Sequence, residues 1–250
     1  MWQNALNKKS LSLTSGALHC LAMFFMLLDH LWATVVPGNE WMTCVGRLAF
    51  PIYAFLTVEG YFHTRDLKKY MLRLLVFALL SEIPFNLMLS GRIWNPVHQN
   101  VLWTFLLGLG LIHWNERLKG APLWRRLLRW GCTMVFGFLV GTLTMIDYYG
   151  FGILMVLTFY LFRGKDWRCL AGQVLLMWWI NAELMGGLVY EIDLLGRIWY
   201  LHQQSFALLA LIPIWLYNGR PGCRKAWFQY FRYCFYPAHM LLLVLLRNIL

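Results

Sequence analysis

The chain has 250 residues, of which 60% are hydrophobic, 17% aromatic and only 13% charged, with a formal net charge of +11. This composition has far more apolar surface than one soluble core needs, so it excludes an ordinary soluble domain. We predict an all-α, polytopic transmembrane helix bundle that forms a single domain over residues 1–250. Apolar and polar residues do not alternate along the chain, which argues against a membrane β-barrel.

Several stretches resemble membrane-spanning helices, each of which needs about 20 mostly apolar residues. The fourth, sixth and eighth of them are the shortest, and the longest connection, 115–126, is too short for a second domain. The predicted spans are 17–36, 41–62, 70–89, 99–114, 127–146, 148–162, 168–190, 203–218 and 228–248. The sequence therefore predicts about nine spans.

The basic residues are unevenly distributed when the N-terminus is taken as cytoplasmic. Lys8, Lys9 and the basic clusters in 65–73 and 117–129 then fall on the cytoplasmic side. The outer side keeps only Arg47, Arg92, Arg197 and Arg247. This bias follows the positive-inside rule, so the net charge reflects topology in a bacterial cytoplasmic (inner) membrane. We expect no nucleic-acid partner.

The N-terminal region is predicted to be a retained helix rather than a signal peptide. No small-residue cleavage site follows Lys8 and Lys9, and the apolar run continues to Val36. The six cysteines form no CxxC motif and no paired set in loops. We therefore expect neither structural disulfides nor a metal site.

Residues 46–86 hold two spans that carry ionisable side chains inside them or at their ends. A charge at membrane depth costs about 2.5–3.5 kcal/mol on insertion scales, so such residues point to function rather than anchoring. Glu59 and His63 share a face near the inner side, where a buried carboxylate needs a cationic partner, and Arg73 is one candidate. Arg47 lies about 18 Å of helical rise from Glu59, so these two residues cannot form one site.

The first span ends with Asp29 and His30 in its outer half. Neighbouring helical residues diverge by about 100°, so Asp29 is not expected to orient the His30 ring, and another helix must supply its partner. Histidine titrates near neutral pH and can take a proton from an amine or hydroxyl, which makes His30 a candidate general base. A purely structural pair near the membrane interface is the alternative.

Polar residues in later spans extend this outer site. Pro84 can kink its helix and free backbone carbonyls at the depth of the neighbouring polar side chains. His239 lies on one helical stripe with Arg232 and Tyr236, and it is either a core histidine or a functional one. The residues assigned to the outer site from these spans are Glu82, Asn86, Gln99, Asn100, Tyr236 and His239.

Six short motifs, in this order and at this spacing, resemble one protein family over essentially the whole chain. They are LLDH (27–30), GRLAFPIYAFLTVEGYFHTR (46–65), SEIPFN (81–86), HQNVLWT (98–104), YYGFGIL (148–154) and YCFYPAHMLLL (233–243). The chain resembles the TraX family, membrane proteins associated with N-terminal acetylation of conjugative F-type pilin. The family pattern carries Asp at the position of Asn86, so a carboxylate role at that position does not transfer to this chain.

The resemblance implies an acyl-CoA-dependent acyltransferase that moves an acetyl group to a small molecule or to a peptide or pilin acceptor. We expect His30 to act as the catalytic base with support from Asp29 or Glu82. Substrate-binding roles are expected for Arg47, Glu59, His63, Asn86, Gln99, Asn100, Tyr236 and His239. The phosphates of acetyl-CoA would bind at the inner face to Arg65, Lys68, Lys69 and Arg73. Because no Ser or Cys lies in a nucleophile motif, we expect direct transfer without an acyl-enzyme.

Two other functions fit the same residues. In a transporter or channel the buried charges would form a proton or ion path, although the chain lacks recognisable repeat halves. In a non-catalytic scaffold the polar cluster would contribute only to stability.

Overall fold

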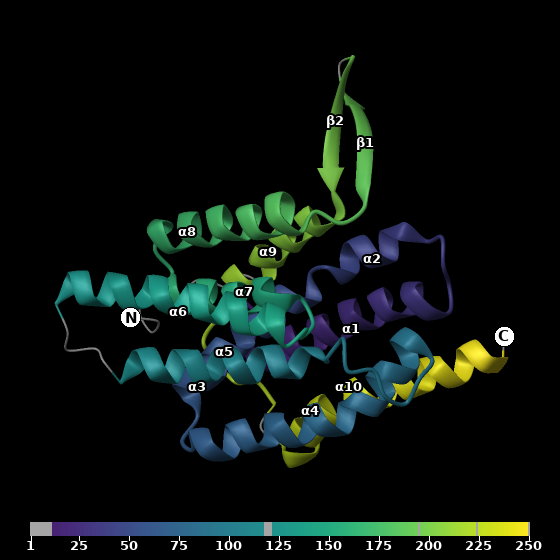
Figure 1. Cartoon of the computed structure of the whole chain (residues 1–250), viewed down its shortest axis with the longest axis horizontal. Helices are drawn as coiled ribbons and strands as arrows, with labels where there is room; N and C mark the ends of the chain where they lie inside the picture. The colour runs from purple at the N-terminus through teal and green to yellow at the C-terminus, as the bar shows by residue number, and fades with distance from the viewer. Residues whose placement is uncertain (1–11, 118–121, 195, 224, 250) are drawn as a thin grey trace.

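The structure is a computed structural model that describes residues 12–117, 122–194, 196–223 and 225–249. It is mostly helical, with one small sheet (Figure 1). The α-helices are Ser15–Thr34 (α1), Glu40–Gly46 (α2), Ala49–His63 (α3), Leu67–Ser90 (α4), Val101–Glu116 (α5), Leu123–Leu143 (α6), Tyr149–Leu161 (α7), Trp167–Trp178 (α8), Leu211–Trp215 (α9) and Ala226–Ile249 (α10). Trp179–Met185 is a π-helix and Gln203–Ala210 a 3₁₀ helix.

Local sequence signals explain where several helices begin and end. The side chains of Thr14, Asp66 and Asp166 accept hydrogen bonds from the first backbone N–H groups of α1, α4 and α8. Gly91 ends α4 in the left-handed conformation that glycine adopts without a steric cost. Pro84 lies inside α4, and the helix continues through it rather than ending there.

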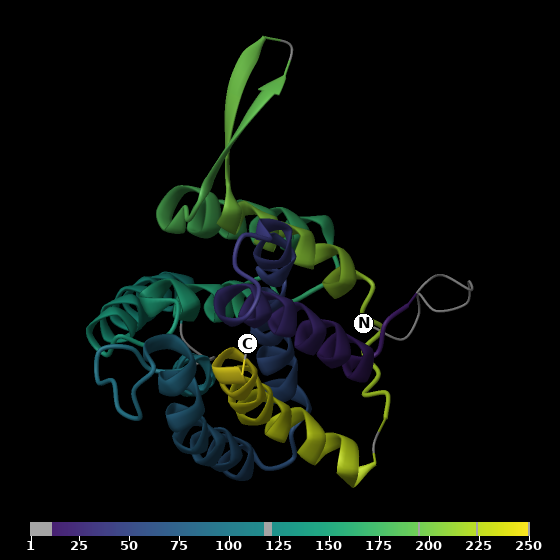
Figure 2. The same ribbon diagram turned by 90° about the vertical axis from the view of Figure 1, so that its right-hand side faces the viewer.

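The apolar core lies around α3 and α7. Buried side chains of α3, such as Ile52 and Phe55, pack with Ile153 and Phe159 of α7 in one large cluster. A smaller cluster joins α1, α3, α4 and α10 and contains Tyr236 and other buried residues. Both views show α10 running beside α1 and α4 (Figures 1 and 2). α1, α4 and α10 therefore form one layer against the core.

The chain also contains a β-hairpin, so the prediction of an all-α fold is wrong for this segment. Strand Val189–Leu194 (β1) pairs antiparallel with Arg197–His202 (β2), and the hairpin projects from the bundle (Figure 1). The predicted span 168–190 wrongly includes the first two residues of β1, Val189 and Tyr190. Gly186 and Gly187, both with positive φ, end the helical path, and the following residues are rich in β-branched and aromatic side chains.

By length and composition, three helical stretches are able to cross a membrane: Ser15–Thr34, Glu40–His63 and Leu67–Ser90. The second of these bends where α2 gives way to α3 at Arg47 and Leu48. A count of nine spans is not supported, because most of the remaining helices among the described residues are shorter or more polar than predicted. The cytoplasmic N-terminus stays a prediction, since Lys8 and Lys9 lie outside the described residues.

The close approach of α6 and α7 yields a stability test. A Cβ added to Gly150 would lie 2.3 Å from the backbone oxygen of Phe138, which cannot move aside cheaply. We expect Gly150→Ala to lower the free energy of unfolding by about 1–3 kcal/mol. Gly110→Ala is the matched control, because no atom lies within 4 Å of its added Cβ and alanine favours the helix. Thermal unfolding in detergent should rank the control at or above the unmodified protein; equal losses for both variants would contradict this packing.

Candidate functional site

An ion pair between α1 and the end of α2 forms the outer part of the candidate site. Arg47 donates to the carboxylate of Asp29, and the Thr43 hydroxyl donates to the same oxygen of Asp29 at 2.6 Å. Gln203 donates to the Thr43 oxygen at 2.9 Å, which ties the segment after the hairpin to this pair. A Cβ on Gly46 would lie 2.4 Å from that of Asp29, so glycine permits the close approach. Three segments thus converge on one carboxylate.

His30, the next residue in α1, contacts α10 rather than Asp29. Its Nδ1 lies 2.7 Å from Nε2 of His239. The two ring planes differ by only 6°, with centroids 4.9 Å apart. His239 is buried, and its Nδ1 lies 2.7 Å from the carbonyl oxygen of Phe235. The prediction that another helix supplies the partner of His30 is therefore consistent with this geometry.

The hydrogen bonds assign the proton positions in this histidine pair. A carbonyl oxygen can only accept, so His239 Nδ1 carries the proton that it donates to Phe235. Nε2 of a neutral His239 is then an acceptor, and His30 donates to it from Nδ1. The lone pair of His30 must lie on Nε2. That atom has no hydrogen-bond partner among the described residues, and the His30 side chain is half-buried.

The backbone just before α7, near Arg47, is strained. Met145, Tyr148 and Tyr149 all have positive φ, which is uncommon outside glycine and is concentrated at functional sites. Tyr148 lies within Coulombic range of Arg47, and Arg47 lies within Coulombic range of His30. The segment before α7 is thus held in an unusual conformation beside the ion pair.

Several predicted site residues lie at this end of the bundle without contacting His30. One carboxylate oxygen of Glu82 accepts from the Asn100 amide at 2.5 Å and from the Trp103 indole at 2.7 Å. Glu82 is thus engaged with α5, and Asp29 with α2. His239, instead of either carboxylate, supports the His30 ring.

The amide side chains of this region are already engaged. The Asn100 amide donates to the carbonyl of Ala78 as well as to Glu82, and the Gln99 amide donates to the carbonyl of Pro96. Asn86 is buried, and its amide donates to the carbonyl of Ile93.

Tyr236 occupies a different place from these amides. It packs in the smaller apolar cluster with Val101 and lies within Coulombic range of Glu82 and Asp147. Tyr236 therefore joins α10 to the start of α5, one turn from His239.

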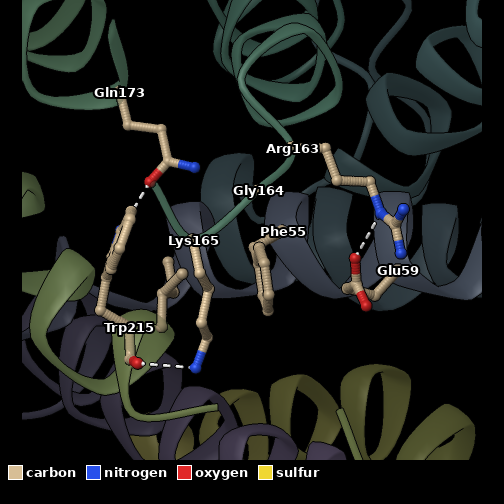
Figure 3. A pocket seen from close by; sticks show the side chains of 8 residues that line it. Phe55, Glu59, Arg163, Gly164, Lys165, Gln173 and Trp215 are labelled. Carbon is tan, nitrogen blue, oxygen red and sulfur yellow. Dashed lines mark hydrogen bonds and ion pairs between the residues drawn. The ribbon is translucent and has the colours of Figure 1, made fainter. Parts of the chain in front are cut away.

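The inner end of α3 holds a separate polar cluster (Figure 3). Arg163 donates from Nε to Glu59 at 2.7 Å, and Glu59 is 4% exposed. The predicted partner Arg73 is wrong, because Arg163 follows α7, which packs beside α3, whereas Arg73 is exposed on α4. His63 donates to the backbone carbonyl of Glu59 at 2.8 Å and lies 3.6 Å from its carboxylate. Glu59 therefore stabilises a helix contact beside a small hollow that Lys165 also lines.

The residues predicted to bind the phosphates of acetyl-CoA lie around the start of α4. Arg65, Lys68, Lys69 and Arg73 are all exposed. Lys69 forms a surface ion pair with Asp66 at 3.4 Å. Exposed cations at one end of a bundle can meet a polyanion, but these contacts alone do not define a pocket.

Sequence reasoning missed several residues of these clusters. Thr43 and Gln203 are neutral donors outside the six motifs, so only their neighbours in space reveal them. Asp147 lies between two predicted spans and outside the six motifs, yet it is half-buried and pairs with His98 at 3.4 Å. The positions of Trp103 and His98 inside the HQNVLWT motif were an available signal.

The Glu59–Arg163 pair predicts a specific pattern of stability changes. Arg163→Met removes the arginine partner of a carboxylate with 5% side-chain exposure, and we expect a loss of about 3 kcal/mol in unfolding free energy. The double variant with Glu59→Gln should lose less than the sum of the two single losses, because no buried charge remains. Arg73→Met should stay within about 0.5 kcal/mol of the unmodified protein. Chemical denaturation in micelles measures all four, and a larger loss for Arg73→Met would contradict the assignment.

The His98–Asp147 pair predicts a pH dependence. Its hydrogen bond to Asp147 raises the pKa of His98 above the ordinary 6.5, against the effect of partial burial, and the charges of Asp147 and Glu82 raise it further. A raised pKa stabilises the fold fully below about pH 6.5, and this contribution is lost as the pH rises through the folded-state pKa. Asp147→Asn should therefore lower the melting temperature at about pH 5.5 and change it little at about pH 9. The difference should vanish in a His98→Gln background; a loss that is independent of pH would contradict it.

Comparisons with known proteins agree with the motif order. The pattern of the family described as TraX protein matches residues 14–247. The chain is 24% identical over 260 residues to a protein of Dichelobacter nodosus described as "Probable fimbrial assembly protein FimC, serogroup H1", covering 94% of this chain and 96% of that protein. No solved structure matches the chain. Because the family match covers nearly the whole sequence, this protein belongs to the TraX family.

Proposed function

We propose that this membrane protein transfers an acetyl or other acyl group from acyl-CoA to an amine or hydroxyl acceptor, with His30 as the general base. The observation that carries the proposal is the His30–His239 pair, whose hydrogen bonds leave the lone pair of His30 on Nε2, an atom without a hydrogen-bond partner among the described residues. A base of this kind must be neutral, correctly oriented and reachable by the acceptor. Membership in the TraX family supports the same chemistry.

The transfer would proceed in one addition and one elimination. His30 Nε2 takes a proton from the acceptor as the acceptor nitrogen or oxygen attacks the thioester carbonyl carbon. The carbon–sulfur bond then breaks, the CoA thiolate leaves, and the proton held by His30 can return to it. His239 stabilises the charged His30 by accepting the hydrogen bond from Nδ1.

Arg47 is the residue best suited to stabilise the oxyanion of the tetrahedral intermediate. Its Nε and Nη2 are occupied by Thr43 and Asp29, whereas Nη1 makes no hydrogen bond in the described part of the chain. Asn100, a candidate from the sequence, has both amide donor bonds committed to Ala78 and Glu82. The role of Asp29 would be to hold the Arg47 guanidinium in place.

A pilin N-terminus is the acceptor class that we favour. The Dichelobacter nodosus relative is described as a fimbrial assembly protein, and the resemblance to the TraX family implies acetylation of a pilin N-terminus. Acyl-CoA is cytosolic, so in the predicted topology it would approach the end of the bundle that carries Arg65, Lys68, Lys69 and Arg73. Its thioester would have to reach the outer half of α1, where His30 lies.

Acetyl transfer can be measured with the purified chain in nanodiscs, radiolabelled acetyl-CoA, and peptides with free N-termini or small amines. His30→Ala should abolish transfer. His239→Gln should retain more activity than His239→Phe, because a glutamine oxygen can still accept from His30 Nδ1. Thermal unfolding of each variant controls for folding.

Full activity of His30→Ala would exclude this base. Proton or ion flux in liposomes without CoA, together with no transfer to any acceptor, would instead support the transporter alternative.

A further inference from the structure

Arg232 of α10 is a cation without an anionic partner in the part of the chain that the structure describes. Its Nη1 lies 3.1 Å and 3.2 Å from the two ring nitrogens of His19, and its guanidinium carbon lies 5.2 Å from the centroid of the Phe228 ring. Its Nε is fully buried and finds no hydrogen-bond acceptor among the described residues. A buried donor without an acceptor is costly, so this arrangement favours a ligand that supplies one.

The groups that face Arg232 are one histidine, one cysteine and three tyrosines. They are His19 and Cys20 of α1, Tyr53 of α3, Tyr70 of α4 and Tyr233 of α10. His19 also lies 2.7 Å from the carbonyl of Ser15, to which its Nδ1 donates, so its Nε2 accepts from Arg232. No carboxylate is among these groups. The usual reason for a half-buried arginine, an internal salt bridge, is therefore missing at this position.

The N-termini of three helices lie at the end of the bundle that carries Arg232. Arg232, His19 and Tyr70 all lie within the first two turns of α10, α1 and α4. At the opposite end, Arg247 of α10 donates to the carbonyls of Leu87 and Met88 in α4, and His239 meets His30 of α1. The three helices therefore run parallel, and their positive dipole ends surround Arg232.

We propose that Arg232, with the N-terminal ends of α1, α4 and α10, forms a binding site for a phosphate or pyrophosphate group. A guanidinium binds phosphate oxygens through two parallel hydrogen bonds, which would satisfy the free Nε. Arg73 and Arg232 both lie within Coulombic range of Tyr70, so a second cation flanks the site. The phosphate belongs either to a soluble CoA-like nucleotide or to an anionic lipid headgroup. Binding of either ligand is a property separate from acyl transfer, because it requires no acyl acceptor.

The test compares equilibrium binding to the full chain in nanodiscs of phosphatidylcholine. CoA and inorganic pyrophosphate are the soluble probes, and pantetheine, which lacks phosphate, is the negative probe. Arg232→Gln should weaken binding of the phosphate probes by about tenfold or more and leave pantetheine unchanged. Arg247→Gln is the matched control, since it removes the same charge from the same helix at the other end. Arg232→Lys keeps the charge but cannot donate two parallel hydrogen bonds. We expect its affinity for the phosphate probes to lie between those of the unmodified protein and Arg232→Gln.

A second arm measures retention of phosphatidylglycerol against phosphatidylcholine by native mass spectrometry for the same variants. An Arg232 effect on CoA and pyrophosphate assigns the site to a soluble ligand, and an effect on phosphatidylglycerol alone assigns it to lipid. Equal binding of every phosphate probe by the unmodified protein, Arg232→Gln and Arg232→Lys would overturn the proposal. His30→Ala should bind all probes normally, so failure of acyl transfer and failure of this site remain distinguishable.

Discussion

The ion pair between Asp29 and Arg47 is the contact on which the outer half of the protein depends. Its two charges lie between helices in a largely apolar chain, where an unpaired charge would be expensive. Thr43 and Gln203 complete the hydrogen bonding, and Gly46 allows the helices to approach. Such a pair contributes little net stability relative to apolar packing, but breaking it is costly. Its consequence is a defined position for the end of α2 and for His30 beside it.

The bundle separates its polar groups into two levels. The outer level, named after the predicted topology, holds the histidine pair, the Asp29–Arg47 pair and the Glu82 cluster. The inner level holds Glu59 with Arg163 and Arg232 with His19. On α1, His19 and His30 are about 16 Å of helical rise apart, so the two levels cannot share one small ligand. An elongated donor with phosphates at one end and a reactive acyl group at the other would suit this separation.

The hairpin connects to the outer level through its base. Tyr190 of β1 lies 3.4 Å from the Cys44 sulfur of α2, and Gln203 follows directly after β2. The π-helix before the hairpin and the three positive-φ residues before α7 are further departures from regular structure. Irregular backbone thus gathers around the end of the bundle that carries His30, whereas α3 and α7 are regular and form the core.

The sequence alone determined the family, the helical character of most of the chain and the identity of most polar residues in the outer site. These follow from composition, apolar run length and motif order, which are local properties. It did not determine the hairpin, because an apolar run of β-branched and aromatic residues fits either a strand or a membrane helix until its neighbours are known.

Only the tertiary structure decided which residues are partners. Glu59 pairs with Arg163 rather than Arg73, and His30 with His239 rather than a carboxylate, because the helices that pack together are distant in sequence. Hydrogen bonds act over about 3 Å, a scale that helix spacing along a chain cannot predict. The residue types of the site could therefore be predicted from the sequence. The pairing that gives His30 a free lone pair was set by the packing of α10 against α1.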